Sequence, residues 1–171
     1  MTGYLARLGA WSCPPHFLTK DPRTPDSHES VELRERCLAV YAEMSLRKIG
    51  DEARFEAWLS DWLDTQSQIA RAAGCSVIVL KHALLALLIP AIARVCDPHW
   101  MLVTRPLAQI EQTRIRRGWF AVFGSAGARR IYSAAFTKLT ELECGYHTVA
   151  FGEFLKNVEA RRALVRSFGL D

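Results

Sequence analysis

Two apolar runs decide the fold of this chain: Ser76-Val77-Ile78-Val79-Leu80, which leads into Lys81, and Trp100-Met101-Leu102-Val103-Thr104, which leads into Arg105. Apolar residues fill both runs almost continuously instead of alternating with polar ones. That pattern is typical of strands covered on both faces. Because helix-forming sequence follows each run, we expect a parallel sheet with helices on either side.

Lys81 and Arg105 therefore stand where each strand ends. In open parallel sheets, ligands bind beyond the carboxyl ends of the strands, and the helix N-termini there favour negative charge. Either residue alone is more simply a solvated strand end. Together, in successive units, they indicate a site for a phosphate or sulfate group, so we expect both side chains to face one crevice.

Composition and charge limit the classes of function. The chain has 171 residues, of which 50% are hydrophobic and 23% charged, as expected of one domain over residues 1–171 with a substantial core. The net charge of +4 permits an anionic small molecule but is too weak to indicate nucleic acid. The one dense basic cluster, Arg114–Arg117, is interpreted as a solvated helix face.

Cysteine and histidine positions predict neither disulfides nor a metal site. The cysteines, at positions 13, 37, 75, 96 and 144, form no C-x-x-C pair, and we expect reduced thiols in a cytoplasmic protein. The histidines, at positions 16, 28, 82, 99 and 147, show no metal-ligand spacing. Residues 83–95 are apolar but shorter than the roughly 20 residues that span a bilayer, so we expect a buried helix and no membrane partner.

The periodicity of apolar residues predicts the order of elements. Before the first strand we expect a short helix over 2–9, a loop over 11–28, a helix from about 28 that Gly50 ends, and a helix from about Asp51 to Gly74. After it we expect strand 76–81, helix 83–95, strand 100–104, helix 107–117, loop 124–127, helix 128–143, strand 147–151 and helix 158–168. This order predicts a helix-rich, three-layer α/β domain.

The segment Leu102–Gly118 resembles the second signature region of the sulfotransferase family. In that family a strand ends in Arg-(Asp/Asn)-Pro, and a serine follows eight positions after the arginine. The arginine and the serine hydroxyl hold the 3′-phosphate of the sulfate donor, phosphoadenosine phosphosulfate (PAPS). The matching residues here are Arg105, followed by Pro106, and Thr113, which keeps the hydroxyl. Thr113 lies two turns along the following helix, on a face that can look back toward the arginine.

Other segments are similar to the same family. Lys81 and His82 match the end of a strand that reads Lys-Asp-Pro or Lys-Thr-His in the family. The resemblance makes them candidate substrate or anion contacts, although neither form of the motif is intact here. The family's phosphate loop, which resembles Gly-x-Pro-Arg-Ser-Gly-Thr-Ser, does not occur, and Thr2–Gly9 looks like the helix that would follow it. The resemblance therefore implies a P-loop-like parallel sheet, truncated at the N-terminus, that lacks its first strand.

The resemblance implies transfer of a sulfuryl group from PAPS to a hydroxyl or amine, with adenosine 3′,5′-bisphosphate as product. Without the loop that acts on the sulfuryl group, we expect little activity, because each lost contact costs on the order of 10²–10³ in rate. The alternative is a non-catalytic interaction module that presents aromatic residues, Trp58, Trp62, Trp119 and Phe120, to a partner protein. An unpaired strand edge would also favour association with a second copy of the chain.

Overall fold

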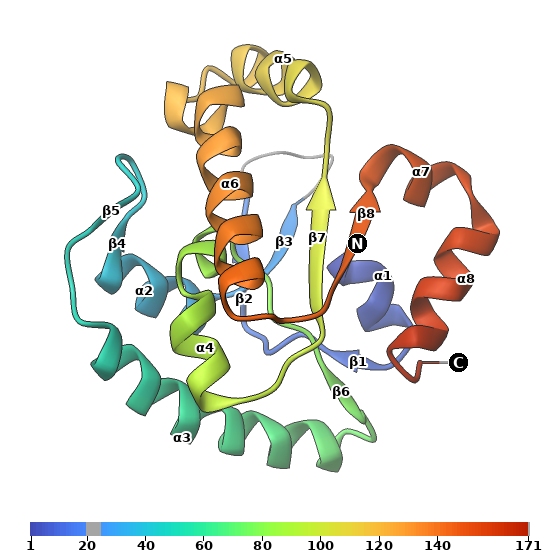
Figure 1. The fold of residues 1–171 in the computed structure, drawn as a ribbon. Helices are drawn as coiled ribbons and strands as arrows, with labels where there is room; N and C mark the ends of the chain where they lie inside the picture. The colour runs from blue at the N-terminus through green and yellow to red at the C-terminus, as the bar shows by residue number, and fades with distance from the viewer. Residues whose placement is uncertain (20–24, 171) are drawn as a thin grey trace.

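The computed structural model describes residues 1–19 and 25–170. It is a mixed α/β, helix-rich fold, as predicted, and its parallel strands form small sheets (Figure 1). The elements are, in order, α1 (Thr2–Arg7), β1 (Ala10–Trp11), β2 (His16–Leu18), β3 (Asp26–Ser30), α2 (Val31–Val40), β4 (Tyr41–Ala42), β5 (Arg47–Lys48), α3 (Glu52–Ala72), β6 (Val77–Ile78), the 3₁₀ helix η1 (Ala83–Leu87), α4 (Ile89–Val95), β7 (Trp100–Thr104), α5 (Leu107–Arg117), the 3₁₀ helix η2 (Ala121–Phe123), α6 (Ser125–Glu141), β8 (Tyr146–Ala150), α7 (Phe151–Lys156) and α8 (Val158–Ser167).

The parallel strands form two separate pairs. β1 pairs with β6, and β7 pairs with β8 over five residues, from Trp100 opposite Tyr146 to Thr104 opposite Ala150. In the described residues β6 and β7 do not pair, so the strands form separate two-stranded sheets instead of one continuous sheet. β6 is shorter than the predicted strand over 76–81, because β1 offers it only two partner residues.

Helices cover both faces of β7, as its apolar sequence predicted. Leu102 packs with Leu139 of α6, whereas Met101 packs into a cluster with Leu5 of α1 and Val165 of α8. Figure 1 shows β7 between α6 on one side and α1 and α8 on the other. The pleat sends successive side chains to opposite faces, so a strand buried on both faces needs apolar residues throughout.

The largest core lies between α2, α3, α4 and η1. The predicted helix after Asp51 is confirmed as α3, and the Asp51 carboxylate accepts a hydrogen bond from the Ala53 amide at 2.9 Å. Trp62 is buried, and Trp58 stacks on it with ring centroids 5.0 Å apart. Trp62 is therefore part of the core, and Trp58 is a partly buried residue that packs against it.

The prediction of a helix that continues to Gly50 is wrong after Val40. α2 ends at Val40, and the chain continues as the antiparallel hairpin β4–β5. The hairpin returns to the end of α2, where the Val40 carbonyl accepts hydrogen bonds from the amides of Ile49, at 2.8 Å, and Gly50, at 3.1 Å. A Cβ on Gly50 would lie 2.1 Å from the Ala39 carbonyl oxygen, which explains why glycine occupies this position.

Three further boundaries differ from the prediction. The segment 83–95 is buried as predicted, but it is divided into η1 and α4, with Pro90 in the first turn of α4, where proline is tolerated. β2 and the start of β3 lie in the predicted loop over 11–28, of which residues 20–24 lie outside the described residues, and β3 continues to Ser30, where the helix was expected to have begun. The predicted loop over 124–127 instead includes the start of α6 at Ser125. Among the described residues, no helix combines the length and apolar character that crossing a membrane requires.

Candidate functional site

Arg105 directly follows β7, at the carboxyl end of the strand. Its backbone amide donates to the Tyr132 hydroxyl of α6 at 3.1 Å, and its guanidinium carbon lies 5.2 Å from the centre of the Phe151 ring. The Nε atom is buried and has no hydrogen-bond partner. Within residues 1–19 and 25–170, Arg105 forms no ion pair, so its positive charge is not matched by a carboxylate.

Thr113 lies on α5, the helix that begins two residues after Arg105. Its hydroxyl donates to the Gln109 carbonyl, one helical turn earlier, at 2.9 Å. In the described part of the chain no hydrogen bond joins Thr113 to Arg105. A phosphate oxygen accepts but does not donate, so Thr113 could contact it only by giving up the bond to Gln109.

Arg114, next to Thr113, has a structural role. Its side chain donates to the Glu111 carboxylate at 2.7 Å and to the Trp119 carbonyl at 3.0 Å. The second oxygen of Glu111 accepts from the Ser125 amide at 2.7 Å, which ties α5 to the start of α6. These bonds, first that from the Ser125 amide and then that from Arg114, lower the pKa of Glu111.

Lys81 follows β6 but is already engaged by β3. Its ammonium donates to the Ser27 carbonyl at 2.5 Å and lies 3.4 Å from a Glu29 carboxylate oxygen. No contact among the described residues joins Lys81 to Arg105. Lys81 lies three residues beyond the end of β6, whereas Arg105 directly follows β7, and the two strands belong to separate sheets. An anion at Lys81 would therefore compete with Glu29.

His82 caps the 3₁₀ helix η1. Its Nδ1 accepts a hydrogen bond from the Leu84 amide at 3.2 Å. Burial, helped by the nearby positive charge of Arg34, lowers the pKa of His82 to about 4. The ring is therefore neutral at neutral pH and brings no positive charge to an anion.

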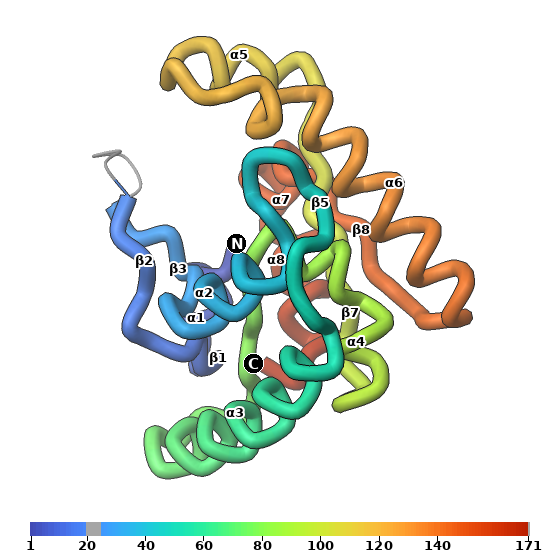
Figure 2. Tube along the Cα trace, turned by 90° about the vertical axis from the view of Figure 1, so that its left-hand side faces the viewer, coloured from blue at the N-terminus to red at the C-terminus, as the bar shows by residue number. Residues whose placement is uncertain are grey.

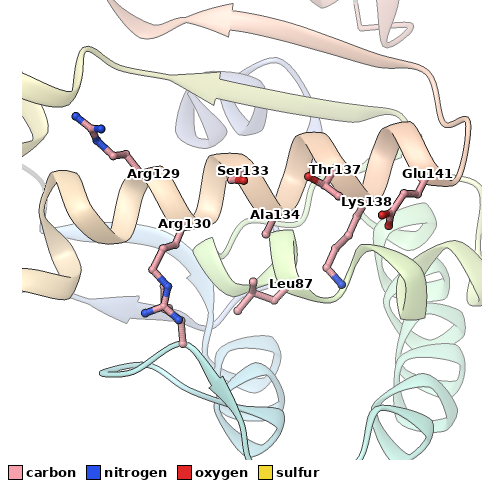
Figure 3. Close-up of a pocket in the computed structure, with 9 residues that line it drawn as sticks. Leu87, Arg129, Arg130, Ser133, Ala134, Thr137, Lys138 and Glu141 are labelled. Atoms are coloured by element: carbon pink, nitrogen blue, oxygen red, sulfur yellow. The ribbon is translucent and has the colours of Figure 1, made fainter.

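A surface hollow of about 620 Å³ lies along α6, away from the predicted residues. In Figure 3, Arg130 and Lys138 extend on the side of α6 that faces Leu87, whereas Arg129 points away. The lining residues are Leu46, Leu87, Arg129, Arg130, Ser133, Ala134, Thr137, Lys138 and Glu141. The hollow includes none of Arg105, Thr113, Lys81 and His82, so it is not the site that the sequence predicts.

The structure brings together three residues that the sequence did not group: His16, Asp26 and His28. His16 Nδ1 lies 2.9 Å from Asp26 Oδ2, and His28 Nδ1 lies 3.5 Å from the same oxygen. The only sequence signal was Asp26-x-His28, since alternate residues of a strand share a face. That signal was missed because residues 11–28 were predicted as a loop.

Comparison with known protein families, with curated proteins and with solved structures finds no match to this chain. The resemblance to sulfotransferases therefore remains an expectation from the sequence, carried mainly by residues 102–118.

Proposed function

We propose that this chain is a sulfotransferase-like protein that binds the 3′-phosphate of PAPS, or of adenosine 3′,5′-bisphosphate, through Arg105. One observation carries the proposal: the buried Nε of Arg105 has no hydrogen-bond partner. Arg105 directly follows β7, at the carboxyl end of a parallel strand. A guanidinium N–H that is buried without a hydrogen-bond partner is costly. A phosphate group matches it well, because two parallel N–H···O bonds can form between them.

The arrangement of strands supports a P-loop-like, three-layer sheet. β1–β6 and β7–β8 are both parallel pairs, and Figure 2 shows β1 and β7 apart from each other. Val77 and Val79 nevertheless pack in the same cluster as Met101, and this proximity supports the proposal that the two pairs belong to one layer. We infer a sheet whose central position, between β6 and β7, no strand of the described residues occupies.

The proposed role is nucleotide binding, and the reaction of the family that the chain resembles is sulfuryl transfer to a hydroxyl or amine acceptor. Such transfer depends mainly on positioning and on positive groups that stabilise charge developing in the transition state. Arg105 would hold the nucleotide end of the donor. Thr113 is a weaker contact, because its hydroxyl already donates to Gln109. We expect nucleotide affinity with little or no transfer activity.

We also propose a reducing compartment, the cytoplasm. The five cysteines form no disulfide in the structure. Burial raises the pKa of the Cys13 and Cys37 thiols to about 12, so both are protonated at neutral pH and unreactive.

Calorimetric titration with two nucleotides tests the site. Adenosine 3′,5′-bisphosphate should bind the wild type more tightly than adenosine 5′-monophosphate, which lacks the 3′-phosphate. Hydrogen bonds to charged groups contribute about 1.5–3 kcal/mol. Arg105→Ala should therefore raise the Kd of the bisphosphate by about 10- to 150-fold and leave that of the monophosphate unchanged. Thr113→Val should have an effect below about fivefold, because Thr113 must exchange one bond for another.

Arg116→Ala is the matched control, because Arg116 is an exposed arginine on the neighbouring helix α5. It removes the same charge without touching the proposed site, so the affinity for the bisphosphate should change by less than about threefold. Equal affinity of the wild type and Arg105→Ala, or equal affinity of the wild type for the two nucleotides, would refute the proposal.

A second candidate function is an interaction module, which one exposed apolar corner favours. Ile115, Trp119 and Phe120, near the end of α5, are 63%, 42% and 68% exposed. The positive charge of Arg117 lies 4.5 Å above the Trp119 ring. If this corner carries the function, Trp119→Ser with Phe120→Ser should abolish association with a partner or a second copy. Nucleotide affinity should then be absent in the wild type.

A further inference from the structure

The β2–β3 hairpin gathers two imidazoles and a carboxylate. His16 begins β2, and Asp26 and His28 occupy alternate positions on β3. The centres of the two imidazole rings lie 5.3 Å apart. One potential ligand atom from each of the three residues lies within 4.8 Å of the others.

The hydrogen bonds of His16 define which of its nitrogens carries a proton. Nε2 lies 3.1 Å from the Ser12 carbonyl, which can only accept, so Nε2 must donate. In the neutral ring, Nδ1 then presents a lone pair to Asp26 Oδ2 at 2.9 Å. Two acceptors at this distance repel each other unless a proton or a metal ion lies between them.

His28 directs its Nδ1 toward the same oxygen. Its Nδ1 is buried, has no hydrogen-bond partner and lies 3.5 Å from Asp26 Oδ2. The other ring nitrogen packs against α1, where a Cβ on Gly3 would lie only 2.2 Å from Nε2. Burial is the main cause of a lowered pKa for His28, with the charges of His16, Lys81 and the chain amino group acting in the same direction and Asp26 opposing.

We propose that His16, Asp26 and His28 form a binding site for a divalent transition-metal ion of the zinc class. Two imidazoles and one carboxylate are ligands that such ions prefer. Metal–ligand distances of about 2.0–2.2 Å in tetrahedral geometry place ligand atoms about 3.3–3.6 Å apart. The two imidazole nitrogens lie 2.9 and 3.5 Å from Asp26 Oδ2, which is close to that spacing, and all three ligand atoms lie within 4.8 Å of one another.

Neighbouring groups already orient the ligands. The Ser12 carbonyl holds the far nitrogen of His16, the usual second interaction of a metal-binding histidine. The Asp26 Oδ1 atom accepts from the His28 amide at 2.6 Å, which leaves Oδ2 for the ion. The three side chains are 13%, 39% and 32% exposed, so solvent can supply the remaining coordination position. Such an ion would join the hairpin to α1 through His28 and Gly3.

Metal titration of the whole chain tests the proposal. Chelator-treated protein is titrated with Zn²⁺ in competition with a chromophoric chelator, and Co²⁺ is added separately to record its absorption spectrum. We expect one equivalent of Zn²⁺ to bind and to raise the Tm. The Co²⁺ bands should indicate nitrogen and oxygen ligands, without the near-ultraviolet charge-transfer band of thiolate, which excludes the five cysteines as ligands.

Asp26→Asn and His16→Gln should each weaken Zn²⁺ binding by at least about 100-fold, since loss of a mere second-sphere partner costs about 10–100-fold. His99→Gln is the control, because His99 is exposed and lies outside the cluster, and it should bind Zn²⁺ like the wild type. Wild-type affinity in both cluster variants overturns the proposal. A wild type that does not bind Zn²⁺ also overturns the proposal if nuclear magnetic resonance shows that His16 is an imidazolium. In that case a proton, and not a metal ion, lies between His16 and Asp26. If a variant fails to fold, the Co²⁺ spectrum of the wild type still tests the proposal, because it needs no substitution. A thiolate charge-transfer band in that spectrum overturns the proposal.

Discussion

Replacing Arg105 with methionine should make the protein more stable while removing its nucleotide affinity. Arg105 is half-buried, its Nε has no hydrogen-bond partner, and it forms no ion pair in the described part of the chain. Methionine has a similar length and can retain the packing of the aliphatic stem. The substitution therefore removes a poorly solvated charge and leaves most of the apolar contacts.

The magnitude follows from two opposing contributions. A buried polar group without a partner costs about 1–3 kcal/mol, and the lower end applies to a half-buried residue. The contact of the guanidinium with the Phe151 ring stabilises the wild type by about 0.5–1 kcal/mol, part of which methionine recovers through its sulfur. The free energy of unfolding should rise by up to about 1 kcal/mol, and the Tm should rise by about 2–4 °C per kcal/mol for a chain of this size.

Urea denaturation followed by far-ultraviolet circular dichroism measures this difference. The matched control is Arg114→Met, which should lower stability by about 1 kcal/mol, because Arg114 donates charged hydrogen bonds to Glu111 and to the Trp119 carbonyl. A loss of stability in Arg105→Met as large as in Arg114→Met would refute the reasoning. It would mean that the fold itself stabilises the charge of Arg105, so that the structure gives no reason to expect an anion there.

Two further substitutions test the local structure. The fold lowers the pKa of His82 to about 4. As the pH falls, His82 therefore takes up a proton in the unfolded chain before it does so in the folded protein. The free energy of unfolding should decrease between about pH 6.5 and pH 4. His82→Asn can still cap the Leu84 amide and should show a smaller decrease in urea midpoint over this range; identical pH profiles would contradict the assignment. Gly127→Ala places a Cβ 1.7 Å from the Val122 carbonyl oxygen and should therefore lower the Tm strongly. Gly118→Ala is the control, because its Cβ meets no atom within 4 Å. It carries only the strain of a positive φ, roughly 1–2 kcal/mol, and should lower the Tm far less. Equal effects of the two glycine substitutions on the Tm would show that α6 can shift away from η2.

Elements with a strong local pattern were predicted well from the sequence. β7 and α5 have the predicted bounds, 100–104 and 107–117, and α3 begins at Glu52, next to the predicted start at about Asp51. In each case the apolar spacing, the capping residue or the terminal glycine acts within a few residues. Such signals do not depend on what the rest of the chain does.

The hairpin β4–β5 could not be predicted in this way. Tyr41 and Met44 continue the apolar spacing of α2, so a longer helix was expected. In the structure Tyr41 is extended and buried, and its hydroxyl donates to Glu52 at the start of α3 at 2.8 Å. The contact with another helix outweighs the modest helical preference of the segment.

The sequence by itself determined the position of Arg105 at the end of an apolar strand, because a continuous apolar run and the charge after it are local features. Only the tertiary structure decided what surrounds that charge, since Tyr132 and Phe151 come from α6 and α7. The same holds for His16, Asp26 and His28. Their convergence depends on the register of β2 against β3 and on the packing of His28 against Gly3. Spacing along the chain does not encode register, because pairing two strands and docking a helix on them are interactions between distant segments.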